Sequence, residues 1–252
     1  NKMINKSKLQ SIISKYYLNG LVQSVRWLTE DNKLSISFTS ENKDIAGDLI
    51  CKNSPVENSE IAIFDTAQLN KLISVTNGEL LLTLEKEHKV FSKLHIQDNS
   101  FNVAYSLADS LLVPKRGTIN FPTEYDVIIE LTPEIVNNFI KAKSALTDIS
   151  DVMISTEEDP DRGTVVQFAF GDLNNFSNKI KYIVDENIEV TLGKELKLPF
   201  NSDSFKNILA ANKDLESGKL SLTEEGFMKL EFQTEDIKTL YYMVRKEDST
   251  YV

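Results

Sequence analysis

Four segments of the chain place apolar residues three or four positions apart, and this spacing predicts four amphipathic helices. Asn19-Gly20 is a stop signal for the first helix, and Asn77-Gly78 closes the second. Thr132 caps the third, and Pro133 takes its first helical position. The predicted helices cover residues 4–18, residues 65–75, a segment from 132 beyond 140, and residues 201–213. Their buried faces are expected to contain Leu9, Ile12, Ile13, Tyr16, Leu69, Leu72, Ile73, Val136, Phe139, Ile140, Phe205, Ile208 and Leu209.

Between the helices lie short runs of mainly apolar or alternating residues, and turn-forming residues separate these runs. Each run has the length and pattern of a β-strand. The fifteen predicted strands cover residues 21–28, 34–39, 45–52, 60–64, 80–84, 90–96, 101–107, 125–131, 152–156, 164–170, 179–184, 196–200, 220–223, 228–233 and 240–245.

The second half of the chain repeats the order of helices and strands of the first half. Residues 64–73 also align with residues 200–209, and apolar residues coincide at four places. Two unrelated amphipathic helices could align this well by chance, but the matching order of elements favours a duplication. We therefore expect an N-terminal domain at 1–108, an extended connector at 109–124 and a C-terminal domain at 125–252.

A length of 252 residues leaves room for two domains of about 125 residues each. The apolar fraction of 41% is that of a soluble globular protein, and no apolar run approaches the roughly 20 residues that span a bilayer. The chain starts without a charged-then-apolar leader, and its single cysteine, Cys51, cannot form an intrachain disulfide. We expect a cytoplasmic protein with an inert core thiol and no membrane contact.

The sequence contains no arrangement of residues that is typical of catalysis or of metal binding. A phosphate-binding loop is missing, because Gly193-Lys194 and Gly218-Lys219 lack a glycine at the required upstream spacing. The two histidines, His88 and His95, fall in a hairpin turn and in a strand, and the acidic segment 157–163 has the proline and glycine of a solvated turn. We expect no enzyme activity, no metal and no cofactor.

Lysine is concentrated on the predicted helices although the chain as a whole is acidic. The net charge of −10 argues against DNA binding through a broadly basic exterior. The four helices carry a net charge of +5, which leaves −15 for the remainder. Lysines often only solubilise an exposed helix face, but a positive bias across the four helices favours a local contact with nucleic acid. The candidate DNA-facing residues are Lys6, Lys8, Lys15, Lys71, Lys141, Lys143, Lys206 and Lys213.

The chain resembles the sliding clamps, a family that includes the eukaryotic and archaeal proliferating-cell clamps and the clamps of tailed bacteriophages. The resemblance rests on the doubled order of elements over essentially the whole chain, on residues 61–65 leading into the second helix, on the connector, and on residues 240–244. Residues 61–65 and 101–124 look most like the phage clamps. The resemblance implies an α+β DNA-clamp fold, in which each of two similar domains packs two helices on antiparallel sheet.

The resemblance also implies a function. A sliding clamp of this kind is a homotrimeric ring whose helices line a central hole, so that it encircles duplex DNA and tethers a DNA polymerase for processive replication. The expected partners are double-stranded DNA without sequence preference, a DNA polymerase, a clamp loader and further copies of the chain. Lysines on the helices agree with this, because they contact phosphates without reading bases. A phage-encoded clamp would act in the host cytoplasm.

Two further sets of residues follow from the resemblance. The strands near residues 101–107 and 179–184 are expected to pair between subunits through Phe101, Val103, Tyr105, Ile180 and Tyr182. A groove for a short apolar or aromatic anchor of a partner peptide is expected at Ile45, Leu49, Leu111, Leu112, Phe121, Tyr242 and Val244. Ile45 and Leu49 fit a domain core equally well. Tyr241 and Tyr242 adjoin on one strand, which leaves one ring for the core and one for the groove.

Other functions fit parts of the pattern. A clamp-like ring or interaction scaffold in DNA repair or virion assembly would share the fold without serving a polymerase. A monomeric processivity factor would have to hold DNA by charge alone, which the acidic balance disfavours. The native mass separates such a monomer from a ring, because a monomer has the mass of one chain, 28.5 kDa, whereas a trimeric ring has three times this mass.

Overall fold

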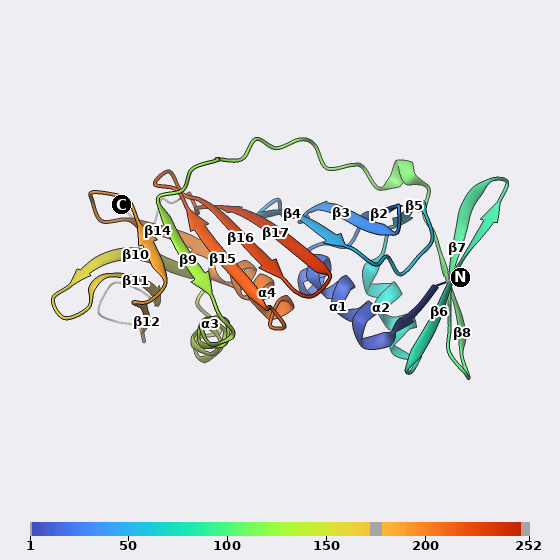
Figure 1. Cartoon of the computed structure of the whole chain (residues 1–252), viewed down its shortest axis with the longest axis horizontal. Helices are drawn as coiled ribbons and strands as arrows, with labels where there is room; N and C mark the ends of the chain where they lie inside the picture. Colours follow the sequence, from blue (N-terminus) through green and yellow to red (C-terminus); the bar gives the residue numbers. More distant parts are fainter. Residues whose placement is uncertain (1, 172–177, 248–252) are drawn as a thin grey trace. The chain divides into compact units, whose positions relative to one another are not determined.

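The computed structural model of the chain describes residues 2–171 and 178–247, which form two compact units (Figure 1). Unit 1 comprises Asn1–Thr118 and Glu235–Thr239, and unit 2 comprises Ile119–Thr234 and Leu240–Val252. The boundary therefore falls within the segment 109–124 that was expected to be a connector, and a short segment near the C-terminus belongs to unit 1.

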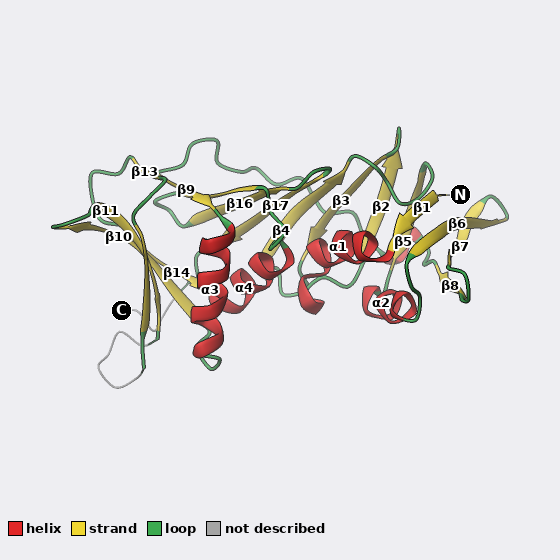
Figure 2. Cartoon of the chain, turned by 60° about the horizontal axis from the view of Figure 1, so that its bottom comes forward, coloured by secondary structure: helices red, strands yellow, loops and turns green. Residues whose placement is uncertain are grey.

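Unit 1 consists of two helices and two sets of four antiparallel strands. The strands pair in the orders β1-β6-β7-β8 and β4-β3-β2-β5. The two helices pack against each other and against strands of the unit (Figure 2). The elements are β1 (Lys2–Asn5), α1 (Lys6–Tyr17), the 3-10 turn η1 (Leu18–Gly20), β2 (Val25–Glu30), β3 (Lys33–Thr39), β4 (Ile45–Cys51), β5 (Ser59–Ile63), α2 (Thr66–Ser74), β6 (Glu79–Glu87), β7 (Val90–Gln97), β8 (Asn102–Ser106) and the 3-10 turn η2 (Ser110–Leu112).

Unit 2 is built in the same way. Its strands pair in the orders β12-β11-β10-β14 and β13-β9-β15-β16-β17, and its two helices pack against each other and against the first of these sets. The first residues of β17 are counted with unit 1. The elements are β9 (Val127–Leu131), α3 (Pro133–Ala145), β10 (Asp151–Asp159), β11 (Gly163–Phe170), β12 (Ile180–Val184), β13 (Ile188–Val190), β14 (Lys197–Asn201), α4 (Ser202–Ala211), β15 (Ser217–Leu222), β16 (Phe227–Gln233) and β17 (Ile237–Val244).

The two units share one topology. The set β9-β15-β16-β17 corresponds to β1-β6-β7-β8, and the set β12-β11-β10-β14 corresponds to β4-β3-β2-β5. Equivalent helices are also capped alike: Asn5 caps α1 as Thr132 caps α3, and Asp65 caps α2 as Asn201 caps α4. In each case a side-chain oxygen accepts a hydrogen bond from a backbone N–H of the first turn. The repeat of elements inferred from the sequence is therefore present in the structure.

The expected α+β class, the four helices and the antiparallel strands are confirmed. Among the described residues the structure adds two strands to the fifteen expected, β1 and β13. It also corrects the strand expected at 21–28. Leu18 and Asn19 have positive φ, Val22 N–H donates to the Tyr17 carbonyl (3.1 Å), and the strand starts only at Val25. Val22, at the start of that segment, is thus buried in a turn that precedes the strand.

Each unit links its two helices by a polar contact at equivalent positions. In unit 1 the Tyr16 hydroxyl of α1 lies 2.9 Å from Thr66 Oγ1 at the start of α2, and burial raises the pKa of this phenol. Counted from the caps, Lys143 of α3 is the equivalent of Tyr16. Its ammonium lies 3.2 Å from Asp203 Oδ1 at the start of α4. The same structural task is therefore carried out by a neutral pair in one unit and by an ion pair in the other.

Candidate functional site

Four of the eight lysines predicted to face DNA are engaged within the protein. Lys6 Nζ donates to the carbonyls of Ser74 (3.1 Å) and Thr76 (2.6 Å), where a cation satisfies the free carbonyls at the end of α2. Lys8 forms an ion pair with Asp236. Lys15 and Lys143 are buried, at 1% and 2% exposure.

The ammonium of Lys143 also donates to two carbonyls that follow α3, those of Leu146 (3.3 Å) and Thr147 (3.1 Å). A buried ammonium needs such partners, because an unpaired charge in the interior is strongly unfavourable. Sequence reasoning missed these roles, because the carbonyl partners of Lys6 and the carboxylate partners of Lys8 and Lys143 are distant in the sequence and only the folded chain brings them near.

The other four lysines are available to solvent. Lys71, Lys141 and Lys213 are exposed and Lys206 is half-buried, and none of their four ammonium groups has a hydrogen bond or ion pair within residues 2–171 and 178–247. Lys213 lies in the turn after α4 and not on the helix, which ends at Ala211. Asn212 ends the helix, since its side-chain amide donates to the Ile208 carbonyl and to the Tyr241 hydroxyl. Half of the predicted positive surface therefore remains.

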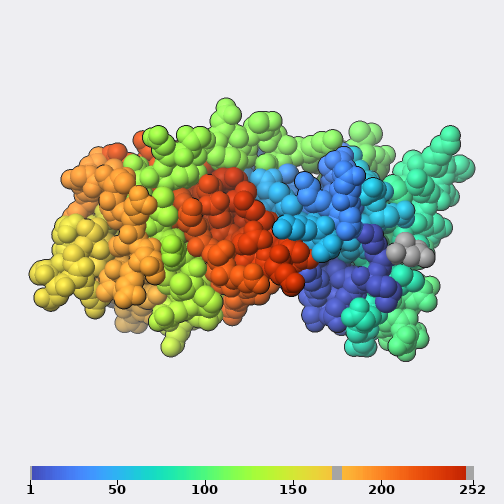
Figure 3. Space-filling view, viewed as in Figure 1, coloured from blue at the N-terminus to red at the C-terminus, as the bar shows by residue number. Residues whose placement is uncertain are grey.

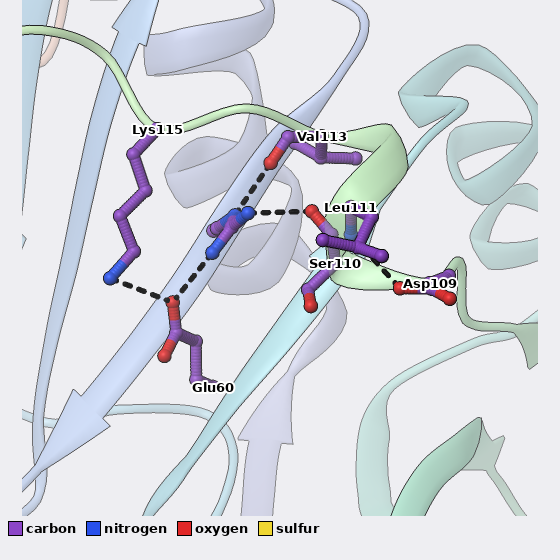
Figure 4. A network of polar contacts seen from close by, with 7 residues as sticks. Glu60, Asp109, Ser110, Leu111, Val113 and Lys115 are labelled. Carbon is purple, nitrogen blue, oxygen red and sulfur yellow. Dashed lines mark hydrogen bonds and ion pairs between the residues drawn. The ribbon is translucent and has the colours of Figure 1, made fainter.

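The start of the connector is held on unit 1 by Arg26 of β2. The Arg26 guanidinium donates to the carbonyls of Val113 and Ser110, both at 2.6 Å, and lies 3.2 Å from Glu60 Oε1 (Figure 4). Lys115 reaches the same carboxylate oxygen at 3.7 Å. Because one planar guanidinium binds both ends of η2, this turn is fixed in orientation.

A second arginine fixes the next part of the connector. Arg116 Nη1 donates to the Gly47 carbonyl of β4 (2.5 Å) and lies 3.2 Å from the Asp48 carboxylate. Asp48 in turn accepts a hydrogen bond from Ser37 Oγ of β3 (2.6 Å). The connector atoms form part of the molecular surface (Figure 3), so these bonds keep an exposed segment in place.

The residues predicted to line the peptide groove fall into different environments. Ile45 and Leu49 were expected to line either the groove or a domain core. Both are fully buried, so they belong to the core. Leu111 and Leu112 of η2 are 86% and 62% exposed, and Val244 at the end of β17 is 57% exposed. Exposed leucines on a fixed turn add little to stability, because apolar groups stabilise a fold only when buried.

Phe121 and Tyr242 stack on each other in unit 2. Their ring centroids lie 3.4 Å apart at an interplanar angle of 8°, and Phe227 meets Phe121 edge-on at 5.8 Å. Tyr241, the neighbour of Tyr242, is fully buried and bonded to Asn212. This is the alternation expected for two adjoining tyrosines on one strand. Phe227 was not predicted, since no pattern in the sequence places it beside the connector.

The two strands predicted to pair between subunits are both edge strands of the described chain. β8 and β12 each have a neighbouring strand on one side only. Phe101 is 47% exposed and Val103, Ile180 and Tyr182 are half-buried. Tyr105 is buried instead, and its hydroxyl donates to the Asp65 carbonyl and accepts from the Asp65 N–H.

Asp98 orders the turn that leads into β8. Its carboxylate accepts hydrogen bonds from the backbone N–H groups of Phe101 (2.5 Å), Ser100 (2.7 Å) and Asn77 (2.7 Å). These donors hold the pKa of the Asp98 carboxyl below its usual range. The edge strand therefore starts from a fixed turn.

His95 and Cys51 are of residue types that often serve in catalytic or metal centres, and the structure shows their environments. His95 Nε2 lies 2.7 Å from Glu85 Oε2 on an exposed hairpin, and this contact lowers the pKa of the Glu85 carboxyl. Cys51 is buried, which raises the pKa of its thiol. No cluster of three or more His, Cys, Asp or Glu side chains suited to a metal ion occurs in the described part of the chain. None of its helices is long and apolar enough to span a membrane.

Comparison with known proteins identifies the fold. No family model and no curated protein sequence matches the chain. The chain is similar in structure to the proliferating cellular nuclear antigen of Entamoeba histolytica, with a TM-score of 0.75 and 12% sequence identity over 98% of both chains. A particular likeness to the phage clamps stays a prediction from the sequence. The chain thus has the fold of the proliferating cellular nuclear antigen, that is, the DNA-clamp fold.

Proposed function

We propose that the chain is a sliding clamp, which forms a ring of three copies around duplex DNA and tethers a DNA polymerase. The observation that carries this proposal is the duplicated clamp fold, matched over 98% of the chain. The clamp has no catalytic activity of its own in this proposal. Its contribution is topological, because a ring on DNA keeps a bound polymerase at a high local concentration.

The repeat supports ring formation through β8 and β12. In the repeat β8 corresponds to β17, and β12 corresponds to β4. Lys52, which follows β4, donates its N–H to the carbonyl of Asp236, which precedes β17 (2.9 Å). Within unit 1 the chain therefore brings the start of β17 to the end of β4. An equivalent pairing of β8 with β12 of another copy would join chains head to tail and would protect two open edges.

The available lysines support a DNA contact without sequence preference. Lys71, Lys141 and Lys206 lie on helices and Lys213 lies just beyond one, whereas the chain as a whole carries a charge of −10. Ammonium groups attract phosphates without reading base edges, so the ring could slide. The acidic remainder would repel DNA from the other surfaces.

The partner-binding surface is proposed on unit 2, at Tyr242 and Val244, where Phe121 lies against Tyr242. An aromatic ring and an exposed valine offer a compact apolar contact, which suits a short anchor from a polymerase or a clamp loader. Partners that share one such site would exchange on it.

The proposal is tested by topological retention on DNA. The full chain is incubated at high concentration with nicked circular duplex DNA, so that rings can open and close, and is then separated by gel filtration in high salt. We expect the protein to stay with circular DNA and to leave after a restriction cut, because only encirclement resists salt. Equal loss from circular and linear DNA would contradict a clamp.

Removal of the four available lysines is expected to weaken DNA association in a graded way. In the K71A/K141A/K206A/K213A variant, the slope of log K against log salt should flatten by up to about 0.9 unit for each phosphate that no longer binds a lysine. Fluorescence anisotropy on a labelled duplex at several salt concentrations measures this slope.

A control variant removes the same number of exposed lysines from strands and turns, at Lys33, Lys89, Lys219 and Lys238. We expect it to retain the wild-type slope. If both variants lowered the slope equally, net charge rather than the helix surface would determine binding.

A further inference from the structure

The connector between Arg116 and Asp126 lacks backbone support. Arg116 holds one end on β4, and Asp126 N–H donates to the Leu222 carbonyl (2.8 Å) at the other end. Between these residues the described structure has no backbone–backbone hydrogen bond. A segment of this kind can shift without breaking a strand ladder, so it opens at lower cost than a paired strand.

Phe121 is the ring that this segment places on unit 2. It lies face to face with Tyr242 and edge-on to Phe227. Ring quadrupoles favour offset or edge-on pairs over a direct face-to-face arrangement. Another aromatic ring could therefore replace Phe121 on Tyr242 and make an offset or edge-on contact of equal or better energy.

We propose that Phe121 occupies the partner site of the free chain, and that an aromatic side chain of a partner peptide displaces it from Tyr242. The inference rests on the proposed docking function of this surface. It specifies the chemistry of the anchor as a flat ring, because the site already accepts a ring from its own chain. Exposed Val244 on the same strand continues the apolar surface beyond the stack.

Self-occupancy lowers the affinity for partners in proportion to the open fraction of the site. Two aromatic contacts near the lower end of their usual strength would keep about nine chains in ten closed. The closed form also covers an aromatic surface that would otherwise promote unspecific association. Removing the Phe121 ring should therefore raise the affinity for an aromatic ligand about tenfold.

The test uses N-acetyl-4-fluorophenylalanine amide as a probe and follows its fluorine NMR signal during titration with the full-length chain. We expect Phe121→Ala to lower the dissociation constant about tenfold relative to wild type. Phe121→Leu keeps the apolar bulk of the residue and serves if the alanine variant does not fold. Tyr242→Ala should abolish binding of the probe, both in the wild-type chain and in combination with a Phe121 substitution. N-acetyl-leucine amide should bind more weakly than the aromatic probe.

The outcomes separate this inference from the docking function. Equal or weaker binding by the Phe121 variants would overturn displacement, while loss of binding in Tyr242→Ala would still support the docking surface. Unchanged binding in Tyr242→Ala would overturn both, because the surface itself would lie elsewhere. Equal binding of the leucine and phenylalanine probes would overturn the preference for a ring.

Discussion

Replacement of Val103 and Ile180 by aspartate is expected to convert the assembled ring into single chains of 28.5 kDa. Val103 lies on β8 and Ile180 on β12, the two edges proposed to pair between copies. If these strands pair, each aspartate places a charge in a contact that excludes water. A buried unpaired charge costs several kcal/mol, and a ring suffers this cost at each of its interfaces.

Native mass spectrometry and light scattering measure the assembly directly. The matched control is Met3→Asp, because Met3 is an exposed apolar residue (63%) on β1, the opposite edge of the same set of strands. We expect the control to keep the mass of three chains. A double variant with the wild-type mass, or a wild-type protein that is itself monomeric, would show that β8 and β12 do not form the interface.

Loss of the interface should also abolish retention on circular DNA, since an open chain cannot be linked to a circle. The two measurements are independent of any polymerase. They therefore test ring formation apart from the docking surface at Tyr242.

The local signals in the sequence located the helices well, because capping chemistry is local. Thr132 and Pro133 define the start of α3, and Asp65 and Asn201 cap the two helices at which the repeat was aligned. The pattern placed Leu72 and Ile140 on the buried faces as well, but both are half-buried, because each lies at the margin of its apolar stripe.

The two missed strands are short and depend on distant partners. β1 pairs with β6 across more than seventy residues, and the expected helix, which began at Ile4, included the last two residues of the strand. Asn5 corrects this boundary, because its side chain accepts from Ser7 N–H and starts the helix at Lys6. The repeat could have predicted β1, because a strand, β9, directly precedes α3 in the second half, and β1 precedes α1 at the equivalent position.

The candidate DNA surface could be predicted only in part. The sequence shows which residues are lysines and on which helix they lie, but a lysine is free or engaged according to its neighbours in space. Lys143 illustrates the limit: its carbonyl partners follow α3 closely, whereas Asp203 lies sixty residues away. The stack of Phe121 on Tyr242 likewise depends on the path of a connector that no periodic pattern constrains.

Phe139→Ala is expected to lower the free energy of unfolding of unit 2 by about 3–5 kcal/mol. Phe139 is 1% exposed and lies at the centre of an aromatic cluster, with ring centroids 4.3 Å from Phe205, 5.1 Å from Phe170 and 5.7 Å from Phe168. Truncation removes the buried area and leaves a cavity between α3, α4 and β11. Aromatic pairs add about 0.5–1.5 kcal/mol each beyond burial, which favours the upper part of this range.

Unfolding in guanidinium measures the loss of stability. Hydrogen exchange followed by mass spectrometry of peptides shows in which of the two units the loss occurs. Protein concentration must be held constant, since assembly stabilises the folded chain. The control is Ile140→Ala on the same helix, a half-buried neighbour that should lose much less stability. We expect faster exchange in unit 2 of Phe139→Ala, including β12, which packs against α3. A loss below about 1 kcal/mol would mean that the cluster repacks around the cavity, and unit 2 would then be more adaptable than its dense aromatic core indicates.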